Sequence, residues 1–198
     1  MSSRFRAAVT AVVALVAVAG FTGVASALTL SISPGGAITG TSTNSNFRAS
    51  GINITCTVNL IGTLVTSVDN TAGRSLGSIT SGTATPCTGG SALVLANPAW
   101  NVSLTNAVPL PLSGVTSTGL TISGVGFLVD IPATALRCLY GGTIRATLTG
   151  TGGIPNRTTG ITVSSQSVPL VANLSARTCP PIGTFSATFS IPTQTISG

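Results

Sequence analysis

The sequence predicts an all-β protein: an antiparallel β-sandwich of roughly ten short strands with two disulfides, preceded by a signal peptide. Apolar and polar residues alternate with a period of two in several segments, as they do in half-buried strands. Clusters of glycine, proline and asparagine separate these segments and supply turns. No segment after residue 27 has the period of 3.6 that predicts an amphipathic helix.

The first 27 residues have the pattern of a secretory signal peptide. Arg4 and Arg6 charge the start, an apolar run follows, and Ala25-Ser26-Ala27 forms an A-x-A cleavage site. The apolar run is short for a membrane-spanning helix, which needs roughly 20 residues. This length favours cleavage after Ala27 over a retained signal anchor. We therefore expect residues 1–27 to be a signal peptide and residues 28–198 to form a single secreted β domain, extracellular or in the cell wall.

Four segments have the clearest strand pattern, because their apolar residues fall on alternate positions: 52–60, 125–131, 144–148 and 185–191. Weaker strand candidates are 28–33, 77–80, 92–96, 100–104, 119–123, 160–164 and 168–171. Turns are expected at 33–36, 88–90, 141–142 and 150–156, where glycine or proline clusters. Valine and threonine, which are frequent here, favour strands because their branched side chains pack well on a pleated surface.

Four cysteines follow the signal segment: Cys56, Cys87, Cys138 and Cys179. An even number in a secreted chain indicates disulfides, and three pairings are open. We favour the sequential pairing, Cys56–Cys87 and Cys138–Cys179. A zinc site made of all four thiolates is the alternative, but such sites use closely spaced cysteine pairs, which this chain lacks.

The composition argues against an enzyme. The chain has no histidine, lysine or glutamate, and its only acidic residues are Asp69 and Asp130. A serine nucleophile needs a neighbouring base, and calcium sites usually take several carboxylates. We interpret Asp69 as a turn residue and Asp130 as the partner of an arginine such as Arg137 or Arg145, rather than as a catalytic pair. We expect no enzymatic activity, no cofactor and no metal.

Basic residues are scattered rather than clustered. Six arginines against two aspartates give residues 28–198 a net charge of +4. A nucleic-acid-binding surface concentrates its charge on one face, so we expect no nucleic acid partner. Anionic cell-envelope polymers, or self-association through edge strands, are the partners that remain. The arginines are Arg48, Arg74, Arg137, Arg145, Arg157 and Arg177.

Two aromatic residues are candidates for a surface binding role. Trp100 and Tyr140 are the only tryptophan and tyrosine of the chain. Exposed residues of these types often mark a binding surface. Both also lie close enough in sequence to cysteines to pack beside the bridges instead, and this core interpretation is favoured.

Short motifs give the chain a resemblance to known secreted proteins. Ser33 to Thr41 reads S-P-G-G-A-I-T-G-T, and four spaced cysteines follow, with Trp100 between the second and third. In this the chain resembles a group of small secreted Gly/Ser/Thr-rich proteins from high-GC Gram-positive bacteria, for which no activity is assigned. The order Cys, Cys, Trp, Cys, Cys is also similar to that of the secreted alkane-oxidation activator proteins. Neither resemblance implies a site residue.

These observations lead to a functional expectation. We expect an exported, non-enzymatic protein with a structural or binding role at the cell envelope. The alternatives are a small outer-membrane-type β-barrel and a secreted fibre or pilin-like subunit. The direction of the apolar faces distinguishes the first alternative, because a membrane barrel turns them outward to lipid.

Overall fold

The structure is a computed structural model that describes residues 28–198, except residues 89–90, 96–98, 111, 113 and 154. The expected signal peptide lies outside the described residues. Eleven strands form one sheet within them: β1 (Thr29–Ser33), β2 (Gly36–Ala49), β3 (Ile52–Leu64), β4 (Ser67–Asp69), β5 (Ser75–Cys87), β6 (Ala92–Leu95), β7 (Trp100–Leu104), β8 (Ser117–Ile131), β9 (Leu136–Gly150), β10 (Asn156–Asn173) and β11 (Ile182–Ser197). In this part of the chain, no helix has the length and apolar character needed to cross a membrane.

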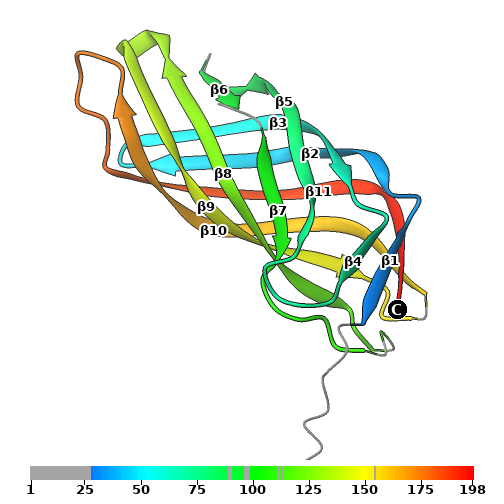
Figure 1. Ribbon diagram of the computed structural model, residues 1–198. Helices are drawn as coiled ribbons and strands as arrows, with labels where there is room; N and C mark the ends of the chain where they lie inside the picture. The colour runs from blue at the N-terminus through cyan, green and yellow to red at the C-terminus, as the bar shows by residue number, and fades with distance from the viewer. Residues whose placement is uncertain (1–27, 89–90, 96–98, 111, 113, 154) are drawn as a thin grey trace, which may run out of the picture.

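Eight of these strands close into an antiparallel barrel (Figure 1). Their order around the barrel is β2, β3, β5, β7, β8, β9, β10 and β11, so each pairs with its neighbours in this order. The ring closes because β11 pairs with β10 on one side and with β2 on the other. The all-β class is thus confirmed, but the expected sandwich is corrected to a barrel, since one continuous hydrogen-bonded sheet replaces two separate ones.

Three short strands lie outside the ring. The pairing of β2 with β11 ends before the C-terminal residues of β11. There β1 pairs with β11 instead, with Ser31–Ser33 opposite Thr195–Ser197. β4 pairs with β1, and β6 pairs with β8. Figure 1 shows β1 and β4 beside the C-terminus, at the end of the barrel opposite the β8–β9 hairpin. We call this the β1/β4 end.

Two barrel strands are longer than the sequence indicated, because each continues through glycines that suggested an interruption. β8 joins the two predicted strands 119–123 and 125–131 through Gly124, whose φ is +76°. β9 runs straight through Gly141 and Gly142, so the turn expected there is wrong. Val125 pairs with Gly142 across the two strands, next to a register shift in β8. A bulge of this kind bends a strand without ending it, and glycine accommodates the unusual backbone angles.

The pleat of the strands turns apolar side chains into the barrel. On β11, Phe185 and Phe189 are buried, whereas Thr188 and Ser190 are exposed. The outer wall is thus coated with Thr, Ser and Asn side chains, and the interior supplies the hydrophobic stabilisation.

Aromatic rings fill the interior toward the end that carries the β8–β9 hairpin. Phe47 packs on Tyr140 with ring centroids 4.8 Å apart. Phe127 packs on both Trp100, at 5.6 Å, and Phe185, at 4.5 Å. Such tilted and edge-on contacts are the favoured geometries of aromatic pairs.

The four cysteines form two disulfides in the favoured sequential pairing, Cys56–Cys87 and Cys138–Cys179. The first joins directly opposed residues of β3 and β5. The second joins β9 to the connection between β10 and β11. Both bridges therefore tie barrel strands to each other or to their loops. Disulfides of this kind belong to an oxidising compartment.

Candidate functional site

An apolar cavity of about 130 Å³ occupies the β1/β4 end of the barrel. Inward-facing side chains of all the neighbouring strands form its wall, among them Leu104 of β7, Leu120 of β8, Leu148 of β9 and Phe189 of β11. None of the described residues that line it is charged. The cavity is partly open to solvent. A hollow in this position arises because the aromatic rings that fill the barrel elsewhere do not reach this end.

The size of the cavity limits what it can hold. An eight-stranded barrel is just wide enough either to be filled by its own side chains or to hold one small ligand. Dry cavities of about 150 Å³ lined by Leu, Ile and Phe are known to bind benzene or xenon. A cavity of about 130 Å³ with a similar lining thus suits an apolar group of about that size.

The connection between β7 and β8 covers this end of the barrel. Its Val108 and Leu112 are buried and line the cavity, so the loop contributes apolar wall. Asn70 holds the loop from one side: its backbone oxygen accepts from Val108 N at 3.1 Å, and its Nδ2 donates to Val108 O at 3.2 Å. These bonds fix the loop to the chain that follows β4.

Asn156, the first residue of β10, holds the loop from the opposite side. Its side chain is 4% exposed and its Nδ2 donates to the backbone oxygen of Val115. Beside it, Gly150 N donates to Thr116 O at 2.8 Å. A Cβ on Gly150 would meet Asn156 Oδ1, so only glycine leaves room for this amide. The Oδ1 atom itself is buried and has no hydrogen-bond partner.

The polar neighbours of Asn156 in the cavity wall are satisfied. Thr158 Oγ1 donates to Gln194 O at 3.4 Å. The side chain of Gln194 accepts from Gly35 N at 3.4 Å and donates to Pro192 O at 3.2 Å. Among the described residues that line the cavity, Asn156 alone has a buried side-chain oxygen without a partner. Leaving a buried acceptor without a hydrogen bond costs about 1–3 kcal/mol of folding free energy. A hydrogen-bond donor that paired with this atom would therefore be stabilising.

Trp100 and Tyr140, the candidates for surface binding, both lie in the interior. Trp100 is 3% exposed and Tyr140 is fully buried, so neither ring is available at the surface to bind another molecule. The surface role is therefore corrected to the core role that the sequence favoured. The reason is the pleat of β7 and β9, which points both side chains inward against Phe127 and Phe47.

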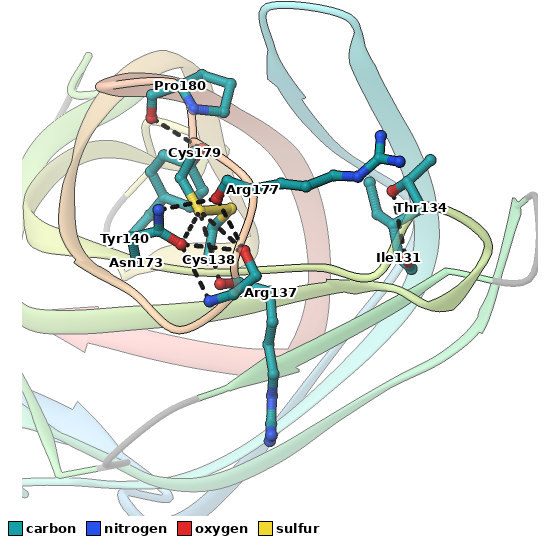
Figure 2. The surroundings of a disulfide bond; sticks show 10 residues. Ile131, Thr134, Arg137, Cys138, Tyr140, Asn173, Arg177, Cys179 and Pro180 are labelled. Carbon is teal, nitrogen blue, oxygen red and sulfur yellow. Dashed lines mark hydrogen bonds between the residues drawn. A yellow bond between two sulfur atoms is a disulfide. The ribbon is translucent and has the colours of Figure 1, made fainter.

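Tyr140 lies beside the Cys138–Cys179 bridge (Figure 2). Its hydroxyl donates to Pro180 O at 3.0 Å, which ties β9 to the loop before β11. Asn173 Oδ1 lies 3.2 Å from Cys179 Sγ of the same bridge. Burial raises the pKa of the Tyr140 phenol above its ordinary value.

We expect the stability of the protein to fall in strong alkali because of Tyr140. The pKa of the phenol is raised in the folded state, so the folded chain keeps its proton at a pH where the unfolded chain has lost it. The associated stability is complete below about pH 10, the pKa of a free tyrosine, and is lost as the pH rises through the folded pKa. Phenolate absorbance measures this directly, because the chain has one tyrosine.

The control is Tyr140→Phe, which should remove the phenolate signal and the tyrosine part of the alkaline loss. Its stability at neutral pH should be lower, because the bond to Pro180 is gone. Phenolate formation at the pH of a free tyrosine, with the fold intact, would contradict the buried position.

The two aspartates form separate ion pairs. Asp130 pairs with Arg137, its cross-strand neighbour, with Oδ2 3.8 Å from Nε, which confirms the interpretation of Asp130. Asp69 is the last residue of β4, not a free turn residue, and its Oδ2 lies 3.2 Å from Arg74 Nη2. The aspartates sit at opposite ends of the barrel, so they do not form a two-carboxylate site.

The remaining surface features do not converge on a ligand. Arg137 and Arg177 lie on either side of the second disulfide, but Figure 2 shows their side chains pointing in different directions. A shallow hollow of about 560 Å³ lies where β2, β10 and β11 bulge apart, and it is open to solvent. Its hydroxyls bond locally: Ser186 Oγ, for example, accepts from Ser165 N at 3.1 Å. The apolar cavity is therefore the candidate site.

Comparison with protein-family models, with curated proteins and with solved structures gives no match. The candidate site is accordingly interpreted from its own geometry. Sequence reasoning missed its residues, because an apolar residue that lines a cavity has the same strand pattern as one in a filled core. Asn156 fell at the end of an expected turn. The one sign in the sequence was Gly150 at the start of that turn, because a glycine permits the close approach of the Asn156 amide.

Proposed function

We propose that this chain is an exported, non-enzymatic binding protein that holds a small, uncharged apolar molecule in the β1/β4 end of its barrel. The observation that carries the proposal is the apolar cavity of about 130 Å³, with no charged residue among its described lining. Pockets for small ligands are typically apolar, with few polar groups, and the mouths of β-barrels are among their usual places. The two disulfides support an oxidising environment outside the cytoplasm.

The direction of the apolar faces favours this role over a membrane barrel. Membrane barrels turn an apolar band and aromatic girdles toward lipid. Here the aromatic rings Phe47, Phe127 and Tyr140 point inward, and the outer wall carries residues such as Thr147 and Thr188. A protein with this outer wall suits water, while its interior suits an apolar guest.

The barrel also offers little edge for growth into a fibre. Fibres built by strand addition need a long unpaired edge. Among the described strands, only β4 and β6 pair with a single neighbour, and they have three and four residues. Residues 80–87 of β5 pair with β3 alone, but every other barrel strand has partners on both sides over part of its length, which favours a binding protein over a fibre subunit.

We expect benzene to bind the purified protein and Leu148→Phe to weaken this binding at least about tenfold. Leu148 lines the cavity, so a larger ring at this position occupies the space that the ligand needs. Methyl NMR titration measures the affinity, and a rise in melting temperature with benzene concentration confirms binding to the folded state.

The matched control is Thr147→Phe on the same strand. Thr147 is exposed on the outer wall, so the same ring there leaves the cavity unchanged and benzene should bind as it does to the wild type. Absence of benzene binding to the wild type, or equal loss in both variants, would contradict the proposal.

A further inference from the structure

We infer that the ligand carries a hydrogen-bond donor, a hydroxyl or an amide N–H, which donates to Oδ1 of Asn156 while its apolar body fills the cavity. This inference rests on the proposed function and specifies its ligand. Two independent observations carry it: the apolar cavity itself, and a buried acceptor in its wall that no protein group satisfies.

The orientation of the Asn156 amide is determined by its partner. Val115 offers a backbone carbonyl, which only accepts, so the nitrogen of the amide must face it. The oxygen is thereby left on the other side, over Gly150, which also lines the cavity. The atom left without a partner is thus an acceptor, not a donor, and a ligand must come within hydrogen-bond distance of this buried oxygen to satisfy it.

The neighbouring polar groups do not compete for this acceptor. Thr158 donates its hydroxyl hydrogen to Gln194 O, and Gln194 donates its amide to Pro192 O. Their donors are already used within the wall. Buried waters typically make two to four hydrogen bonds, whereas Asn156 Oδ1 is the one buried side-chain atom without a partner among the described lining residues. A ligand with one donor and an apolar body matches this site better than water does.

The lining also excludes charged ligands. None of the described lining residues carries a charge that would pair with a carboxylate, phosphate or ammonium group. Burying an unpaired charge is far more costly than burying a hydroxyl that has one partner. The ligand class is therefore a neutral alcohol, phenol or amide of about the size of a substituted benzene ring.

Benzyl alcohol and anisole test the inference, because they are isomers with one benzene ring and one oxygen, and only the alcohol donates. We expect benzyl alcohol to bind the wild-type protein about 3- to 10-fold more tightly than anisole, the range of one net hydrogen bond. In Asn156→Leu, which removes the acceptor in a side chain of similar size, this preference should fall to about 1-fold.

Asn70→Leu is the matched control. Asn70 also bonds the covering loop, through Val108, but it does not line the cavity. This variant should loosen the loop yet keep the preference for the alcohol. If Asn156→Leu does not fold, the comparison of the two isomers on the wild-type protein still decides.

The outcomes separate the two proposals. Equal binding of both isomers to the wild type, with loss of both in Leu148→Phe, would leave the cavity as the site and overturn the donor inference. A preference that persists in Asn156→Leu would also overturn it. If neither isomer nor benzene binds, the proposed function fails and the inference fails with it.

Discussion

Replacing Phe127 by alanine is expected to lower the free energy of unfolding by about 3–5 kcal/mol. Phe127 is 1% exposed and its ring contacts both Trp100 and Phe185, so its removal leaves a hole where three rings meet. The cost combines the lost burial of the ring with the cavity that remains, because surrounding side chains relax only partly. Urea unfolding, followed by tryptophan fluorescence, measures the change.

The control for this prediction is Thr147→Ala on the outer wall. Thr147 is exposed, so its truncation should change the unfolding free energy by less than about 0.5 kcal/mol. A loss below about 1 kcal/mol for Phe127→Ala would mean that the aromatic cluster does not form the packed core of the barrel.

The second large effect is expected from the double variant Cys56→Ala, Cys87→Ala. The bridge closes a loop with a sequence separation of 31 residues. In the loop-entropy description, a bridge of this span stabilises the folded state by about 4 kcal/mol by restricting the unfolded chain. Thermal and urea unfolding should both show the loss, whereas the variant should still be exported.

The bridge in the other part of the barrel provides the comparison. Cys138→Ala with Cys179→Ala removes a loop of 41 residues, so its predicted entropic loss is similar. Wild-type stability in the Cys56 and Cys87 double variant would contradict that bridge, and the second pair would show whether the assay detects such a loss.

Part of the fold could be predicted from the sequence because its strands alternate clearly. Residues 100–104 were expected as a strand and form β7 with these bounds. β2 was missed because the inward positions Gly40, Ser42 and Ser45 are small or polar, which hides the apolar alternation. Gly40 lies beside the ring of Phe189, and this arrangement becomes visible only once the barrel has closed.

Closure itself could not be predicted from local patterns. It depends on β11 pairing with β2, in which residues such as Phe185 and Phe47 are far apart in sequence. A sandwich and a barrel share the same alternation, and they differ only in whether the last strand meets the first. Glycines added to the uncertainty, because Gly142 reads as a turn in the sequence but lies within β9, opposite the register shift in β8.

The candidate site was the least predictable part. Its main feature is missing volume, and no residue type marks missing volume in a sequence. The expectation of no hydrolytic activity, by contrast, rests on composition alone: with no histidine, lysine or glutamate, the chain lacks the usual bases of hydrolytic sites.

The central claim is that the β1/β4 end of the barrel holds an apolar cavity that accepts a guest. A crystal of residues 28–198 under xenon pressure tests it most directly, because xenon enters apolar cavities of about this size. We predict an anomalous xenon peak between Leu120, Leu148 and Phe189. A cavity without xenon, collapsed or filled with ordered water, would contradict the account.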